Sequence, residues 1–308
     1  MMIHIPFKQQ FLKLLPFILL TVFINFNFSF AAEINHSFIA FGGETFIATG
    51  DGKISWQIPK SSRDGWLLPN GNVLLAVSKG KEYPGGAVVE INKENKTVFE
   101  FKGTQSEVNT VMPLDNGNIM FTEAGPKPRL VEITREGKIL VDMPIQAQTK
   151  DHHLQTRMAR KLPNGNYLIP QLLDKVVREY SPDGKIVWEV KTPNWPFTAI
   201  RLPDGNTLIN CTLGNLVIEV DPKGKTVWSL SNDDLPGKPI NDACGGHRLP
   251  NGNTVITSHH AKANETKLFE VNRDKKIVWT YTNPKNASIH HFQILDTNGE
   301  PITGKPLR

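Results

Sequence analysis

The stretch Leu68-Pro69-Asn70-Gly71-Asn72 recurs along this chain of 308 residues. The pattern begins again, with small changes, at Leu114, Leu162, Leu202 and Leu249, and a degenerate copy begins at Leu295. Successive leading leucines lie 40 to 48 residues apart. A period of this length is typical of one supersecondary unit that is copied around a ring or along a stack. The repeat therefore predicts an architecture before it predicts a function.

Each repeat unit reads as four short strands joined by tight turns. The Asn-Gly turn separates the first two strands, and a Gly-Lys turn, as in the stretch 183–188 that ends at Trp188, separates the last two. Both turn types need a positive φ, which Gly and Asn supply. Residues 217–220 and 254–256 are β-rich, and nothing reads as a long helix. Four strands per unit predict the blade of a β-propeller, in which Trp188 packs against the neighbouring blade.

The two ends of the repeat region predict how the ring closes. Residues 37–43 and 45–59 match the second, third and fourth strands of a blade, and residues 290–296 match a first strand. One composite blade is thus built from both ends, which gives an all-β, six-bladed propeller over residues 32–308. An open β-solenoid is the alternative, but it gives no reason for the ends to share a unit.

The first 31 residues are predicted to be a secretory signal peptide. Lys8 and Lys13 form a basic start, which is followed by an apolar run at 14–23, and cleavage is expected after Ala31. Asn25 and Asn27 interrupt the apolar stretch, which disfavours the alternative of an uncleaved anchor spanning ~20 residues. The mature protein is expected to be periplasmic or secreted, monomeric and free of the membrane.

The charge content limits the expected partners, and the cysteine content limits the possible disulfides. The 35 Lys and Arg residues exceed the 30 Asp and Glu residues and are interspersed with them, so nucleic acid is not expected as a partner. Cys211 and Cys244 are the two cysteines, and export leaves a disulfide between them open. The alternative for Cys244 is a small buried residue.

Propeller geometry predicts which face carries the function. The near-identical turns share one face, and the connections that vary in length and composition share the other, as functional loops do. The position five residues before each leading leucine should lie at the mouth of the central channel, where it holds Arg63, Asn109, Arg157, Phe197, Cys244 and His290. Seven of the nine histidines map to this face, including His153, His247, His259 and His291.

The residue types at the mouth favour an anionic ligand. Guanidinium and imidazole groups bind anions, whereas histidines alone would suit a transition metal. Glu107 and Asp242 are the acidic residues expected there, too few to favour calcium. Adjacent strand residues point to opposite sides, so any single histidine could equally be structural.

The repeated Leu-Pro-Asn-Gly-Asn and Gly-Lys-x-Val-Trp motifs resemble exported bacterial propellers of the arylsulfotransferase-like group and the pyrroloquinoline-quinone-binding-like propeller repeats. The first resemblance implies a channel histidine that accepts a sulfuryl group, a role for His290 or His247, with Arg63 and Arg157 holding sulfate oxygens. Quinoprotein dehydrogenases use eight blades and an acidic calcium site, neither of which is evident, so no cofactor is predicted.

Three functions remain open at this stage. The first is binding of a small anion, such as a sugar acid, an aryl sulfate or a sulfated glycan, by Arg63, Asn109, Arg157 and the histidines. The second is an enzyme on the same site, with sulfuryl transfer or a histidine-assisted lyase or hydrolase reaction. The third is a protein-interaction platform, for which Trp195 and Tyr83 are the candidate exposed aromatic residues.

Overall fold

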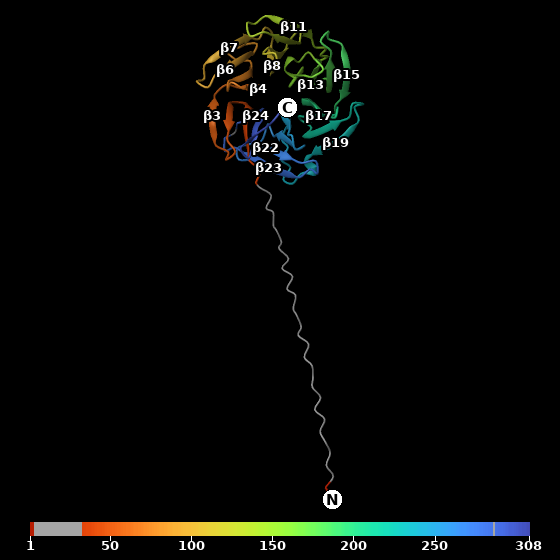
Figure 1. The fold of residues 1–308 in the computed structure, drawn as a ribbon. Coiled ribbons are helices and arrows are strands. Elements are labelled where there is room, and N and C mark those ends of the chain that lie inside the picture. Colours follow the sequence, from red (N-terminus) through yellow and green to blue (C-terminus); the bar gives the residue numbers. More distant parts are fainter. Residues whose placement is uncertain (3–32, 286) are drawn as a thin grey trace. The chain divides into compact units, whose positions relative to one another are not determined.

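The computed structural model describes residues 1–2, 33–285 and 287–308. Residues Ile34–Arg308 form one compact unit, in which six antiparallel sheets surround a central axis (Figure 1). This arrangement confirms the predicted six-bladed propeller and excludes the open solenoid. The predicted signal peptide, apart from residues 1 and 2, lies outside the described residues.

Five blades are continuous in sequence, and their strands follow one another from the axis to the rim (Figure 1). The first consists of β4 (Ser62–Leu67), β5 (Val73–Val77), β6 (Ala87–Ile91) and β7 (Thr97–Lys102). The second consists of β8 (Glu107–Pro113), β9 (Ile119–Ala124), β10 (Arg129–Ile133) and β11 (Ile139–Pro144). The third consists of β12 (Arg160–Lys161), β13 (Tyr167–Gln171), β14 (Val176–Tyr180) and β15 (Ile186–Lys191). The fourth consists of β16 (Pro196–Arg201), β17 (Thr207–Cys211), β18 (Leu216–Val220) and β19 (Thr226–Ser231). The fifth consists of β20 (Gly246–Arg248), β21 (Thr254–Thr257), β22 (Thr266–Val271) and β23 (Ile277–Thr282).

The sixth blade is built from both ends of the chain, as the sequence predicts. β24 (Ile289–Thr297) pairs with β1 (His36–Gly42), which is followed outward by β2 (Thr45–Ala48) and β3 (Ile54–Ile58). A short β25 (Glu300–Pro301) pairs with β24 on its other edge. The pairing of β1 with β24 runs from His36 opposite Thr297 to Gly42 opposite Ile289. Backbone hydrogen bonds between the chain ends therefore close the ring.

The recurring Leu-Pro-Asn-Gly-Asn stretch forms the turn between the first two strands of a blade. In the first blade, the amide of Leu68 donates to the carbonyl of Asn72, and the amide of Gly71 donates to the carbonyl of Leu68, both at 2.8 Å. Gly71 has a φ of +82°, a region that side chains with a Cβ rarely occupy. The Asn70 side chain accepts from the Asn72 amide at 3.0 Å. The Asn-Gly pair of the repeat therefore has a conformational reason.

The last asparagine of the repeat also reaches a buried glutamate on the third strand of its own blade. Asn72, Asn166, Asn206 and Asn253 donate to Glu90, Glu179, Glu219 and Glu270 respectively. A cationic or imidazole group from the next blade pairs with each of these carboxylates. Glu90 pairs with Arg135, Glu179 with Arg201, Glu219 with both Arg248 and Arg273, and Glu270 with His36. In the second blade, Glu132 pairs with Lys161 of the third. The glutamates thus link neighbouring blades around most of the ring.

Tryptophan on the outer strand makes the second contact between blades. The indole Nε1 of Trp188 donates to the carbonyl of Pro222 at 2.8 Å, and that of Trp228 donates to the carbonyl of Arg273 at 3.1 Å. The guanidinium of Arg201 stacks over Trp188, with its Cζ 4.6 Å from the ring centroid. The predicted packing of this tryptophan against the neighbouring blade is confirmed.

We expect Glu219→Ala to lower the free energy of unfolding by about 3–5 kcal/mol, because it leaves Arg248 and the Asn206 amide without their buried partner. Chemical denaturation measures this loss. Lys238→Ala, which removes an exposed ion pair with Asp233, should cost less than about 1 kcal/mol. Equal losses in the two variants would contradict the structural role of the buried glutamates.

Helical structure is limited to two short 3-10 turns in the described part of the chain, η1 (His152–Leu154) and η2 (Asn232–Asp234). None of the helices within the described ranges has the length and apolar character needed to cross a membrane.

Candidate functional site

A β-bulge on the innermost strand positions the first set of site residues. Pairing of β4 with β5 skips Arg63, pairing of β8 with β9 skips Asn109, and pairing of β16 with β17 skips Phe197. His290 is skipped in the same way on β24. A bulge redirects a side chain out of the regular strand pattern, and such bulges are common beside functional sites. In these four blades, the position five residues before the leading leucine is therefore a distinct structural position.

Three of the bulged residues, Arg63, Phe197 and His290, line a cavity of about 190 Å³ at the channel mouth. Its polar lining residues are Arg63, His153, Arg157, Asp242, His259, His260 and His290. Its apolar lining residues are Leu154, Leu172, Trp195, Phe197 and Leu213, with Cys244 and Thr212 completing the wall. Arg63, Phe197 and His290 come from innermost strands, and the other lining residues come from connections between blades and from loops between second and third strands, as predicted for the functional face.

Arg157 is the most unusual charged group of the cavity. Its side chain is buried, and it donates one hydrogen bond, from Nη1 to its neighbour's carbonyl, that of Thr156, at 2.7 Å. Its Nε has no partner, and no carboxylate in the described part of the chain forms an ion pair with it. Burial, followed by repulsion from Arg63, lowers the pKa of Arg157 to about 9. The group remains charged at neutral pH in a place that disfavours charge.

Arg63 is held in place by Glu107, which is buried beneath the mouth. The Glu107 carboxylate lies 3.4 Å from Arg63 Nη2, 3.0 Å from His153 Nδ1 and 2.7 Å from Lys79 Nζ. Burial alone would raise the pKa of Glu107, but the hydrogen bond from His153 and the charge of Arg63 outweigh it and lower the pKa to about 2. Glu107 is therefore ionised, while the Nε of Arg63 stays without a partner.

His259 and His290 form a neutral pair in the wall of the cavity. Their ring centroids lie 4.0 Å apart, and the Nδ1 atom of each is buried without a partner. Burial and the neighbouring His260 lower the pKa of His259 to about 4. Burial, His259 and Arg63 together lower the pKa of His290 well below its ordinary value. Each ring therefore offers an uncharged nitrogen at neutral pH.

The structure brings five of the eight predicted site residues to the cavity and places three elsewhere. Arg63, Arg157, His153, His259 and His290 line it. Asn109 is buried on β8 with both amide atoms unpartnered, but it is not among the lining residues. His247 is buried on β20, where its Nδ1 accepts from the Ile294 amide at 3.2 Å. His291 is buried on β24, and its Nδ1 accepts from the Phe292 amide at 2.9 Å.

The floor of the channel holds a buried ionic cluster that the sequence reasoning missed. Asp64 accepts from Arg160 Nη1 at 2.8 Å and from Arg308 Nη2 at 3.1 Å. Arg308 thus reaches the axis, where the C-terminus lies at the centre of the ring (Figure 1). The sequence offered one signal for this cluster. Asp64 directly follows the mouth residue Arg63 at the start of a repeat, so a carboxylate was to be expected close to the channel.

The two cysteines are free thiols that do not form the disulfide left open by the sequence. Cys211 packs on β17 among apolar residues between the third and fourth blades, whereas Cys244 packs with Phe197, Met158 and Leu172 beside the cavity. Burial raises the pKa of both thiols, to about 12 for Cys211. Cys244 is thus the small buried residue of the alternative interpretation.

Two further expectations concern metal and exposed aromatic residues. Within the described ranges, no three His, Cys, Asp or Glu side chains are arranged to hold a metal ion. Tyr83, which was expected to be exposed, is buried, and its hydroxyl donates to Glu100 at 2.6 Å. Trp195 is half-buried and lines the mouth.

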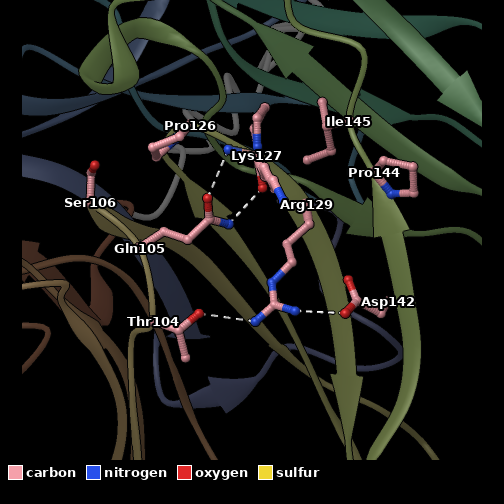
Figure 2. A pocket seen from close by; sticks show the side chains of 10 residues that line it. Thr104, Gln105, Ser106, Pro126, Lys127, Arg129, Asp142, Pro144 and Ile145 are labelled. Carbon is pink, nitrogen blue, oxygen red and sulfur yellow. Dashed lines mark hydrogen bonds and ion pairs between the residues drawn. The ribbon is translucent and has the colours of Figure 1, made fainter.

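A larger hollow of about 930 Å³ lies on the second blade, but none of its described lining residues holds a buried polar atom without a partner (Figure 2). Arg129 donates to Asp142 at 2.6 Å and to Thr104 at 3.1 Å, and the Gln105 side chain bonds both backbone groups of Lys127. Unpartnered polar atoms gather at the mouth instead, so the smaller cavity is the candidate site.

We expect stability to fall as the pH is lowered from 7 to 5, with His259 contributing about 2 kcal/mol. Because the folded-state pKa of His259 is lowered to about 4, the unfolded chain binds a proton below pH ~6.5 that the folded state resists. Urea denaturation at both pH values should show that the free energy of unfolding falls less between pH 7 and pH 5 in His259→Gln than in the wild type. His260→Gln, at an exposed position, is the control. An unchanged loss in His259→Gln would contradict the burial argument.

Comparisons with known proteins agree with the fold. The sequence model of the family described as "Mal s 1 allergenic protein-like" matches residues 49–250, more than half of the chain. Among curated proteins, none matches the sequence significantly. The propeller fold implied by the arylsulfotransferase-like resemblance is confirmed, whereas the activity that it implies stays a prediction.

Several solved structures superimpose on most of this chain and share its fold. A protein of unknown function from Bacteroides caccae has a TM-score of 0.75 at 21% identity and covers 88% of this chain and 100% of its own. Virginiamycin B lyase from Staphylococcus aureus has a TM-score of 0.56 at 16% identity, and the match covers 79% of this chain and 85% of the lyase. A chain of a nidogen/laminin complex has a TM-score of 0.61 at 11% identity, and the match covers 84% of this chain and 98% of that one. At these identities the likeness concerns the fold alone.

Proposed function

This chain belongs to the Mal s 1 allergenic protein-like family, and we propose that it is an exported propeller that binds a small anionic ligand at its channel mouth. The observation that carries the proposal is Arg157, a buried guanidinium without a carboxylate partner among the described residues. Burying a charge is unfavourable unless it is paired. A bound anion would supply the missing partner, and the unpartnered Nε of Arg63 would supply a second donor.

The other buried arginines show that Arg157 is an exception. Arg160 and Arg308 are also buried, and both pair with Asp64. Arg157 instead lies in the wall of an open cavity with the neutral imidazoles of His259 and His290. An arginine that needs an anion, beside neutral hydrogen-bonding groups, is the arrangement of a binding site. The size of the cavity favours a small molecule over a glycan chain, because pockets for larger ligands are typically ~300–1,000 Å³.

A thermal-shift screen tests this function. Inorganic sulfate, glucuronate and phenyl sulfate should each be compared with potassium chloride at the same ionic strength. A ligand present at 100 times its Kd stabilises the folded state by about 2.7 kcal/mol, which raises Tm measurably. Glucose and phenol are the uncharged controls. If no anion raises Tm beyond the chloride effect, the binding proposal must be abandoned.

A second candidate is an enzyme on the same site, and the neutral, unpartnered His290 favours it. In sulfuryl transfer, a His290 nitrogen would attack the sulfur of an aryl sulfate while the sulfur–oxygen bond to the phenol breaks and the phenolate leaves. A phenol acceptor would then take the sulfuryl group and release its proton, restoring the imidazole. A neutral imidazole has the free electron pair that the first step requires.

Incubation with 4-nitrophenyl sulfate and a phenol tests the enzyme candidate through release of 4-nitrophenolate. His290→Ala should abolish release if His290 is the nucleophile. The same measurement on His247→Ala tests the sequence-based role of that residue, which lies outside the cavity. Release by the wild type that persists in His290→Ala would remove His290 from the proposed reaction.

A further inference from the structure

The mouth cavity is divided into a polar and an apolar half. Arg63, His259 and His290 come from the first, fifth and sixth blades and form the polar half with Arg157. Leu154, Leu172, Trp195, Phe197 and Leu213 come from the third and fourth blades or from the connections that enter them. Arg157 enters with the third blade and lies over the Phe197 ring, so the two groups of residues meet at this arginine.

The apolar half includes flat aromatic surfaces. The Phe197 and His290 rings are nearly parallel, with an interplanar angle of 13° and centroids 6.1 Å apart. The Arg157 guanidinium lies over the Phe197 ring, with Cζ 5.6 Å from its centroid. Trp195 is half-buried beside them, and its amide is fixed by the Asn194 side chain at 2.8 Å. Flat walls of this kind suit a ring.

Leu213 supplies an exposed apolar side chain to the wall of the cavity. It is 55% exposed and has a φ of +52°, an uncommon conformation for leucine. Asp242 holds this conformation by accepting from the Leu213 amide at 2.7 Å. An exposed leucine that is held at the rim of a cavity in a strained conformation points to contact with a ligand.

We propose that the ligand is a small amphipathic carboxylate, with its anionic group at Arg157 and Arg63 and one apolar ring against Trp195, Phe197 and Leu213. This inference rests on the proposed anion binding and narrows its ligand class. A polyhydroxylated sugar acid fits less well, because its hydroxyl groups would face Leu172 and Leu213 without hydrogen-bond partners. Inorganic anions would fill the polar half and leave the apolar half in water.

Isothermal titration calorimetry with four probes tests the inference: phenylacetate, glucuronate, inorganic sulfate and uncharged 2-phenylethanol. Phenylacetate should bind at least tenfold more tightly than each of the other three. The result that overturns the inference is glucuronate binding as tightly as phenylacetate, which would leave the proposed anion binding intact. If none of the three anions binds, the proposed function itself fails.

One matched pair of variants locates the ring of the ligand. Leu213→Gly removes the side chain at a position where the backbone already favours glycine, so the fold should be retained. It should weaken phenylacetate binding several-fold and leave sulfate binding unchanged. Leu173→Ser, at an exposed leucine that is not part of the cavity wall, should change neither. An equal effect of Leu213→Gly on both probes, or no effect on phenylacetate, would overturn the placement of the apolar half.

Discussion

Replacement of Arg157 by methionine should weaken anion binding about a hundredfold while leaving the ligand-free protein at least as stable as the wild type. The Arg157 guanidinium has one backbone hydrogen bond and no ion pair with the described residues. Without a ligand it is a buried charge that opposes folding, and methionine fills a similar volume without charge. We expect the free energy of unfolding to rise by about 1–2 kcal/mol, since an uncompensated buried charge is destabilising.

Two measurements check this expectation, namely anion titration and chemical denaturation of the ligand-free protein. Arg160→Met is the matched control, because Arg160 is also buried but is paired with Asp64. It should lower the free energy of unfolding by about 3–5 kcal/mol, since it weakens a buried ionic cluster. If Arg157→Met destabilises the protein as much as Arg160→Met does, Arg157 has a structural partner and the ligand argument loses its basis.

Replacement of Asp64 by asparagine should produce the largest loss of stability, about 5 kcal/mol. Asp64 is fully buried and bonds Arg160, Arg308 and the Thr110 hydroxyl. Burial alone would raise its pKa, but Arg160 and Arg308 hold that pKa well below its ordinary value. The neutral amide would remove the carboxylate charge that both buried guanidinium groups share at the centre of the ring.

A double-mutant cycle tests whether this loss comes from the ionic cluster. Arg308→Met removes one guanidinium and leaves Asp64 paired with Arg160. In the double variant, asparagine at position 64 faces one uncompensated arginine instead of two. The summed losses of the single variants should therefore exceed the loss in the double variant by more than about 1 kcal/mol. Additive losses would show that Asp64 and Arg308 do not act together.

The architecture could be predicted because its cause is local and repeated. The Leu68–Asn72 turn needs a positive φ at Gly71, so the repeat itself records where each blade turns. The degenerate copy at Leu295 marked the strand that the N-terminal residues complete, and β24 pairs with β1 as expected. The buried glutamates that join the blades were missed, although Glu90 and Glu219 stand in equivalent third strands.

The site could be predicted only in part, because it depends on where the strands are irregular. Counting five residues before each leading leucine found Arg63, Arg157 and His290 correctly at the mouth. The same reasoning could not separate His290 from His291, whose side chain lies away from the cavity. Strand pleating and the bulge at position 290 decide between these neighbours, and neither is visible in the sequence.

The sequence by itself determined the number of blades, the closure of the ring by both ends of the chain, and the face on which variable residues collect. These features follow from turn chemistry and hydrophobic alternation, which act between residues that are close in sequence. Only the tertiary structure decided that Arg157 lacks a carboxylate while Arg160 has one, and that apolar side chains gather on one side of the mouth. Pairing and burial of charge depend on residues from different blades, far apart in the chain, and no local pattern records them.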